Sequence, residues 1–168
     1  MSCYLPAMKI IFLDIDGVLN SQDFFRRKHE ETGLTQGGSR AESIDPDALR
    51  LLERIVEETD AKIVVSSCWR IGRTTEELRD LLKEADFKYY DRIIDRTKND
   101  GSFTTKRGDE IEEWLSRNPV KNSADFIILD DDSDMGNLFG SLVQTLWCQG
   151  LTEHEVKIAI ERLNHTNE

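Results

Sequence analysis

Aspartates follow directly on two apolar segments of the chain. Asp14 and Asp16 stand one residue apart in "IIFLDIDG", and the three residues from Asp130 to Asp132 are consecutive in "DFIILDDD". Carboxylates held close together raise each other's pKa unless a cation neutralises them. Oxygen ligands of this kind suit Mg²⁺, which takes one or two carboxylates together with phosphate oxygens and water. The residue types therefore indicate a magnesium site, provided that the fold brings the two groups together.

Three apolar runs could position these acids, over residues 9–16, 62–68 and 125–132. Runs of Ile, Val, Leu and Phe without alternation are typical of strands covered on both faces, as in a parallel sheet. Residues 89–94 and 142–147 are weaker strand candidates.

Helical patterns lie between the strands, several of them with N-cap signals such as Asp45 before Pro46. They cover residues 45–59, 74–85, 108–117 and 152–163. The alternation predicts an α/β fold of three layers (α/β/α), Rossmann-like, with a central, mainly parallel sheet.

The 168 residues fit one domain, residues 1–168. Residues 18–43 contain a polar, glycine-bearing stretch, which we interpret as a loop or flap inserted after the first strand. In such a sheet the carboxyl ends of the strands meet at one edge. The first acids would therefore lie beside Ser66 and Ser67, which end the second apolar run, and beside the second acidic group.

Composition excludes several classes of function. A net charge of −11 argues against a protein that coats nucleic acid, because that binding depends on Lys and Arg. No apolar run approaches the length that spans a bilayer, and "MSCYLPAMKI" does not look like a signal peptide. The three scattered cysteines favour a reduced, cytoplasmic setting. We expect the three tryptophans to pack rather than to bind bases.

With these residues in view, the chain resembles the haloacid-dehalogenase-like (HAD) phosphohydrolases. The resemblance rests on "FLDIDGVL", "VVSSCWR" and "IILDDDSD", in the order and spacing of the family's motifs over about residues 9–135. Within the superfamily, "SSCWR", "RGDEIEEWL" and "ILDDDSDM" look similar to the HAD domains of multi-enzyme RNA-repair proteins.

The resemblance implies roles for the first two motifs. Asp14 would be the nucleophile that forms an aspartyl-phosphate, and Asp16 would be the general acid and base. Gly17 would permit a tight backbone turn. Ser66 would donate a hydrogen bond to the phosphoryl group, with Ser67 as the alternative.

The resemblance also implies a metal shell made by Asp14, Asp16, Asp130 and Asp131. Asp134 is a further candidate, and Asp132 is expected to face solvent. For the cation that stabilises phosphate charge, Lys106 is favoured by residue type, and Arg107 is the alternative. Arg70 would either reach the phosphate or pair with a helix carboxylate, and the sequence favours neither.

The gaps at 18–61 and 71–105 are too short for the folded cap of many HAD enzymes, so the site should be open. By resemblance, the substrate is a nucleic-acid terminal phosphate, with the basic segment at 25–28 as a backbone contact, or a small phosphomonoester. A regulatory module that binds phosphate or metal without catalysis is the alternative, although such a module has no need of Asp16. The sequence does not determine the oligomeric state.

Overall fold

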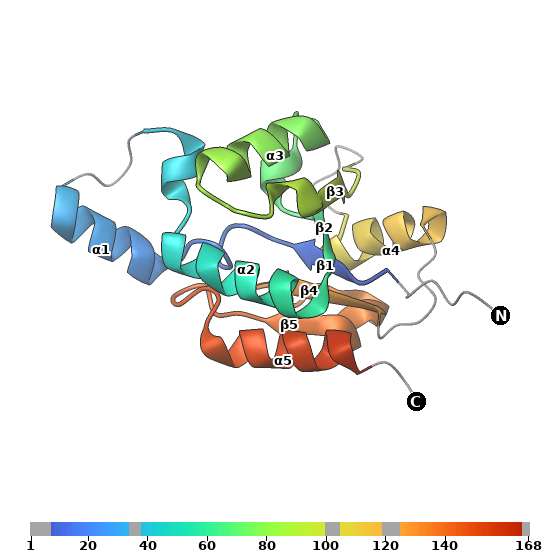
Figure 1. Cartoon of the computed structure of the whole chain (residues 1–168). Helices are drawn as coiled ribbons and strands as arrows, with labels where there is room; N and C mark the ends of the chain where they lie inside the picture. Colours follow the sequence, from blue (N-terminus) through green and yellow to red (C-terminus); the bar gives the residue numbers. More distant parts are fainter. Residues whose placement is uncertain (1–7, 34–37, 100–104, 119–124, 166–168) are drawn as a thin grey trace.

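A five-stranded parallel sheet forms the centre of the computed structural model, which describes residues 8–33, 38–99, 105–118 and 125–165. The strand order is β3-β2-β1-β4-β5, with every pair parallel (Figure 1). The strands are β1 (Ile10–Leu13), β2 (Lys62–Val65), β3 (Ile93–Arg96), β4 (Phe126–Asp130) and β5 (Leu142–Gln144). The predicted parallel sheet is confirmed. The opening segment 1–7 lies outside the described residues.

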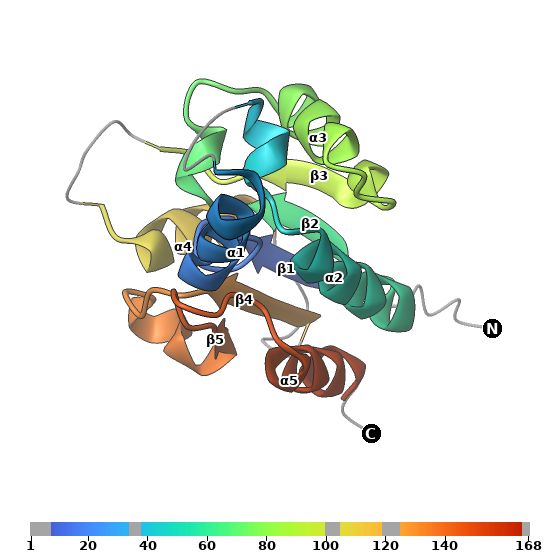
Figure 2. The same ribbon diagram turned by 90° about the vertical axis from the view of Figure 1, so that its left-hand side faces the viewer.

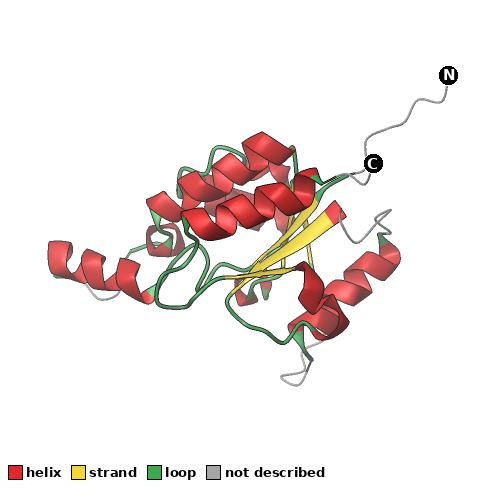
Figure 3. Ribbon diagram, turned by 90° about the horizontal axis from the view of Figure 1, so that it is seen from below, coloured by secondary structure: helices red, strands yellow, loops and turns green. Residues whose placement is uncertain are grey.

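Helices cover both faces of the sheet, as Figure 3 shows from below. One face packs against α2 (Pro46–Thr59), α3 (Thr75–Glu84) and α5 (Glu153–Asn164), and the other packs against α4 (Arg107–Arg117). Alternate strand residues divide between the two cores, because successive side chains point to opposite faces. Leu13 faces the first core, whereas Phe12 meets Trp114 of α4, with ring centroids 5.3 Å apart. The three-layer architecture is confirmed.

The predicted helix starts are also confirmed. Asp45 caps α2 by accepting a hydrogen bond from the Asp47 amide at 2.9 Å. The starts of α3 and α5 both form capping boxes, in which a threonine side chain and a glutamate three residues later bond each other's backbone.

The flap after β1 contains a helix that the sequence did not predict. Helix α1 (Gln22–Thr32) begins at Ser21, whose Oγ accepts from the Phe24 amide at 3.1 Å, and ends at Gly33, which has a φ of 70°. A 3₁₀ turn, η1 (Arg40–Ser43), follows. Helix α1 projects beyond the body of the molecule (Figure 1) and buries only Phe24, so it lacks the apolar period that announces a packed helix.

Among the described residues, three further connections form 3₁₀ turns: η2 (Cys68–Arg70), η3 (Tyr90–Arg92) and η5 (Gly136–Ser141). The weak strand candidate at 89–94 is therefore partly η3, and β3 begins only at Ile93. In the described parts of the chain, no second sheet or helical cap accompanies the α/β core. Nor is any described helix long and apolar enough to cross a membrane.

Candidate active site

The acidic residues meet at the carboxyl edge of the sheet, which faces the viewer in Figure 2. Strands β1 and β4 are neighbours with Leu13 opposite Leu129, so Asp14 and Asp130 leave the sheet side by side. The Asp14 amide donates to the Leu129 carbonyl at 2.9 Å and extends this pairing by one residue. Oxygens of Asp14, Asp130 and Asp131 all lie within 4.8 Å of one another. The sheet register therefore assembles a three-carboxylate cluster from residues more than a hundred positions apart.

Both serines at the end of β2 are buried beside this cluster. The Ser66 amide donates to the Leu13 carbonyl at 2.9 Å, and the Ser66 hydroxyl is buried with no protein partner in the described chain. The Ser67 hydroxyl accepts from the Trp69 amide at 3.3 Å and lies near enough to Asp14 to lower the pKa of that carboxyl. Ser67 is thus the serine in contact with Asp14, whereas Ser66 has a hydroxyl still available to a ligand.

The cation at the cluster is Arg107, the first residue of α4. Its Nε lies 3.3 Å from Asp130 Oδ2, and its Nη2 lies 3.9 Å from Asp14 Oδ1. Lys106, which residue type favoured, is the exposed N-cap residue of α4, and no ion pair ties it to the acids. Of these two neighbours, Arg107 is the one whose side chain reaches the acids. The structure therefore places Arg107, the alternative, beside the acids, and the role of either residue toward phosphate stays a prediction.

The loop after β4 fixes the start of α4. Asp134 Oδ2 accepts from the Arg107 amide at 3.1 Å, and the Asp134 carbonyl accepts from the Gly108 amide at 3.2 Å. A Cβ at Gly108 would lie 2.3 Å from the Met135 carbonyl oxygen, so only glycine permits this approach. Asp134 thus caps the helix and does not join the carboxylate cluster, and Asp132 is exposed as expected.

Arg70 is a buried structural residue, which corrects its assignment to substrate binding. Its side chain is 1% exposed and forms an ion pair with Glu110 of α4. Its guanidinium also donates to the carbonyls of Thr97, Ser66 and Ser67 at 2.7 to 2.9 Å. Burial lowers the pKa of Arg70, and the charge of Glu110 opposes that shift. The alternative of pairing with a helix carboxylate is the one that the structure shows.

Asp16 lies apart from the three-carboxylate cluster and is held by two side-chain donors. Trp69 Nε1 donates to Asp16 Oδ2 at 2.9 Å, and Asn20 Nδ2 donates to Asp16 Oδ1 at 2.9 Å. Asn20 also accepts from the Gly17 amide at 3.1 Å, so it links the acid to the turn. Neither donor was predicted as a site residue from the sequence, although Trp69 stands within the "SSCWR" segment on which the resemblance rests.

Gly17 is required both by its backbone conformation and by its neighbour. Its φ of 78° is rarely adopted by residues with a side chain, and a Cβ there would lie 2.5 Å from the Asp131 carboxyl carbon. The predicted tight turn is present, and it brings the backbone of the first acidic motif into contact with the last one.

A tight turn after β5 is hydrogen-bonded to the turn at Gly17 and to the start of α1. Thr145 Oγ1 donates to the Gly17 carbonyl at 2.6 Å, and the Gln22 amide of α1 donates to the Trp147 carbonyl at 3.2 Å. Leu146 and Trp147 lie between these anchors with exposed fractions of 59% and 49%. The expectation that Trp147 packs is therefore wrong.

Comparison with protein families gives a match over most of the chain. Residues 10–156 match the family described as "HAD domain in Swiss Army Knife RNA repair proteins". The chain belongs to this HAD family. The matched range contains the clustered acids, both serines and Arg107. Comparison with curated proteins gives no match.

In this HAD domain the acid cluster is short of positive charge. Burial raises the pKa of Asp14, and the charge of Arg107 and the Ser67 hydroxyl offset part of that rise. Burial and the charge of Asp14 raise the pKa of Asp130 to about 7, and the same two causes raise the pKa of Asp131. Burial would lower the pKa of Arg107, but Asp14 and Asp130 raise it above its usual value. One guanidinium therefore faces three carboxylates.

The residues of the cluster fit a divalent cation. Asp130 Oδ2 is buried without a hydrogen-bond partner among the described residues, and a bound cation would satisfy it. Arg107 Nη1, which also has no partner among them, is a donor and would instead suit a phosphate oxygen. Mg²⁺ favours a donor set made only of carboxylate oxygens with room for phosphate. Asp14, Asp130 and Asp131 can supply such donors, whereas Asp16 does not belong to the cluster.

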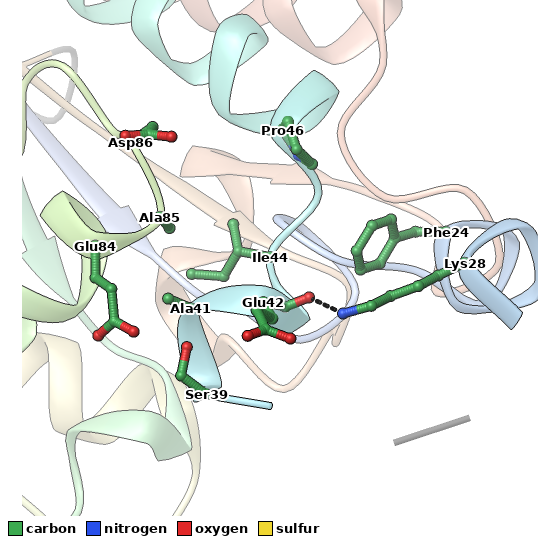
Figure 4. A pocket seen from close by; sticks show the side chains of 10 residues that line it. All are labelled: Phe24, Lys28, Ser39, Ala41, Glu42, Ile44, Pro46, Glu84, Ala85 and Asp86. Atoms are coloured by element: carbon green, nitrogen blue, oxygen red, sulfur yellow. Dashed lines mark hydrogen bonds between the residues drawn. The ribbon is translucent and has the colours of Figure 1, made fainter. Parts of the chain in front are cut away.

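A separate pocket lies between the flap and the end of α3 and has a volume of about 480 Å³ (Figure 4). Its floor is apolar, and its rim carries Glu42, Glu84 and Asp86 with Lys28 as the cation, whose Nζ is held by the Glu42 carbonyl. An acidic rim disfavours a phosphate, and none of the clustered carboxylates lines this pocket. The candidate active site is therefore the open sheet edge.

Proposed function

We propose that this HAD domain is a Mg²⁺-dependent phosphatase that cleaves phosphomonoesters through an aspartyl-phosphate on Asp14. One observation carries the proposal: the Asp14 carboxylate lies within a cluster that contains two more acids, beside the Arg107 guanidinium and a buried serine. This set offers a nucleophile, positive charge for a phosphoryl group and ligands for a cation.

In the first step an Asp14 carboxylate oxygen attacks phosphorus, and the bond between phosphorus and the ester oxygen breaks. Asp16 gives its proton to that leaving oxygen, so an alcohol departs. Arg107 and the Ser66 hydroxyl donate hydrogen bonds to the phosphoryl oxygens. When bound, Mg²⁺ supplies charge that offsets the repulsion between the carboxylate and the phosphate.

In the second step Asp16, now a carboxylate, takes a proton from water as the water oxygen attacks phosphorus. The acyl phosphate bond breaks, phosphate leaves, and the Asp14 carboxylate is restored. Each residue returns to its starting state with one ester bond hydrolysed.

The substrate we propose is a terminal phosphate on a nucleic acid. The family description names RNA-repair proteins, and the described chain carries no cap over the site. Trp147 and Leu146 add an exposed apolar surface on a turn hydrogen-bonded to the catalytic loop. Aromatic side chains of this kind stack on bases of single strands. A small phosphomonoester is the second candidate, because an open edge also admits one.

Hydrolysis of p-nitrophenyl phosphate tests the proposed reaction. We expect turnover with Mg²⁺, none with a chelator, and a loss of at least about a thousandfold in Asp14→Asn, because removing the nucleophile blocks the first step. Full activity in Asp14→Asn or in chelator would refute the mechanism. An Mg²⁺-binding protein with no turnover would instead support the regulatory module. A panel of end-phosphorylated oligonucleotides and small phosphomonoesters then identifies the substrate class.

We further propose that the chain acts as one catalytic domain in the cytoplasm. Cys68 and Cys148 are free and exposed, which suits a reducing compartment. Expression in a cell, followed by fractionation and by limited proteolysis of the purified chain, tests both points.

A further inference from the structure

Asp16 is oriented by one donor on each of its carboxylate oxygens. The indole N–H of Trp69 bonds Oδ2 at 2.9 Å, and the amide of Asn20 bonds Oδ1 at 2.9 Å. Asp16 itself is half-buried, on the turn after β1. A carboxylate with both oxygens bonded cannot rotate about χ1 or χ2 without breaking a hydrogen bond, so its direction relative to Asp14 is fixed.

Trp69 is itself held firmly. Its side chain is 4% exposed, its amide donates to Ser67 Oγ at 3.3 Å, and its carbonyl accepts from Arg73 at 2.9 Å. The guanidinium of Arg40 lies over the indole ring, 5.0 Å from its centroid, within the range of a cation–π interaction. Arg40 belongs to η1 of the flap, so the flap and the end of β2 hold this indole between them.

We propose that Trp69 is a positioning residue for Asp16 and that Arg40 of the flap keeps its indole in place. The inference deepens the proposed phosphatase reaction and rests on it. A general acid works only when it is within hydrogen-bond reach of the leaving oxygen, and a misplacement of about 1 Å can cost a hundredfold in rate. Trp69 restricts Asp16 to one orientation before the substrate arrives.

The leaving group separates positioning from general stability. An alkoxide needs a proton as it leaves, whereas p-nitrophenolate leaves readily without one. A misdirected Asp16 therefore slows alkyl phosphates selectively, and a damaged fold slows both substrates alike. Because kcat/KM covers only the steps up to loss of the leaving group, it reports this difference without the later hydrolysis of the aspartyl-phosphate.

The chain offers a matched control in Trp114, which is also buried and donates its indole N–H to an aspartate. Its partner is Asp95 of β3, at 2.7 Å, and it packs under the sheet against Phe12. Trp114→Phe thus removes the same kind of hydrogen bond from a residue that does not hold Asp16.

The experiment compares kcat/KM for glycerol phosphate and p-nitrophenyl phosphate in wild type, Trp69→Phe, Trp114→Phe and Asp16→Asn, each with its melting temperature. In Trp69→Phe we expect about a tenfold loss on glycerol phosphate, the worth of one hydrogen bond to a charged group, and little change on p-nitrophenyl phosphate. Asp16→Asn should change the ratio of the two rates further, and Trp114→Phe should leave it as in wild type. If Trp69→Phe does not fold, Trp69 can instead be replaced by benzothienylalanine, which has sulfur in place of the indole N–H. We expect this analogue to show the same loss of about tenfold on glycerol phosphate and little change on p-nitrophenyl phosphate.

An unchanged rate ratio in Trp69→Phe or in the sulfur analogue would overturn the inference, whether or not both rates fall. Arg40→Met should shift the ratio in the same direction by a smaller factor, and an unchanged ratio there would remove the flap from the proposal. Absence of turnover by wild type on both substrates would refute the proposed function itself. That outcome can be told apart from an unchanged rate ratio in the Trp69 variants or in Arg40→Met, because those results require an active wild type.

Discussion

Arg107 lies with its Nε 3.3 Å from Oδ2 of Asp130, and Asp130 is fully buried. The pair joins the start of α4 to the end of β4, two elements on different layers of the fold. Because Asp14 also lies 3.9 Å from the same guanidinium, the basic residue is directed at the proposed nucleophile and not at solvent.

Replacing Arg107 by Met should lower kcat/KM for p-nitrophenyl phosphate by about a hundredfold, in the range seen when a donor to a developing oxyanion is removed. Lys106→Met is the matched control, one residue away on the exposed N-cap, and should change kcat/KM by less than about twofold, because exposed charges interact weakly. Steady-state assays of both variants check this. A larger loss in Lys106→Met would restore Lys106 as the cation of the site.

Removal of Mg²⁺ should make stability depend on pH in a defined direction. The pKa of Asp130 is raised to about 7 in the folded chain, so between about pH 4 and pH 7 the unfolded state releases this proton more readily and folding is penalised as pH rises. A cation on the cluster should relieve that penalty. Thermal unfolding in chelator and in Mg²⁺, at pH 5.5 and pH 8, should show a larger gain from Mg²⁺ at pH 8. A difference of roughly 3 °C corresponds to about 1 kcal/mol in a chain of this size.

Asp130→Asn is the control for that experiment, because it removes the proton that is released. Its stability should vary less with pH over the same range. An equal gain from Mg²⁺ at both pH values in wild type would contradict the proposed occupancy of the cluster.

The buried ion pair between Arg70 and Glu110 should dominate local stability. Arg70→Met leaves Glu110 buried without its charged partner and should cost about 3 to 5 kcal/mol of unfolding free energy. Arg54→Met breaks the exposed pair with Glu153 and should cost less than about 1 kcal/mol. Urea unfolding of the two variants provides the comparison, and similar losses in both would show that Arg70 is not a structural anchor.

Trp147→Ala should weaken action on nucleic-acid ends and spare small substrates. Stacking of one base on an aromatic side chain is worth about 1 to 3 kcal/mol, so kcat/KM for an end-phosphorylated oligonucleotide should fall at least about fivefold, with no change on p-nitrophenyl phosphate. Phe139→Ala serves as control, because Phe139 is similarly exposed, at 56%, but lies on η5 in the crossover between β4 and β5. Equal rates for wild type and Trp147→Ala on the oligonucleotide would favour a small phosphomonoester.

The fold could be predicted from the sequence because its strongest signals are local. The buried strands carry uninterrupted apolar runs, and the helices after residues 45, 74 and 152 carry side-chain caps, so each local signal agrees with the parallel sheet. Helix α1 escaped notice because it buries a single side chain, and its cap at Ser21 had no apolar period beside it.

The site could be predicted only as far as the strand ends define it. The parallel pairing of β1 with β4 brings Asp14 beside Asp130. That pairing could be predicted because both strands are apolar runs that end in aspartate. Which of two adjacent basic residues faces the acids depends on where α4 begins, and the Asp134 cap sets that point. The burial of Arg70 depends on its ion pair with Glu110, forty residues further along the chain. The residues near Arg70 in the sequence do not indicate that this pair forms.

The contact between Gly17 and the Asp131 carboxyl group ties two motifs that lie far apart in the gene. A Cβ at residue 17 would lie 2.5 Å from the Asp131 carboxyl carbon, so residue 17 cannot gain a side chain while Asp131 stays in place. Across related chains, the two positions are therefore expected to covary. A relative that carries alanine at the first should carry a shorter residue than aspartate at the second, and would then lack one of its three clustered acids.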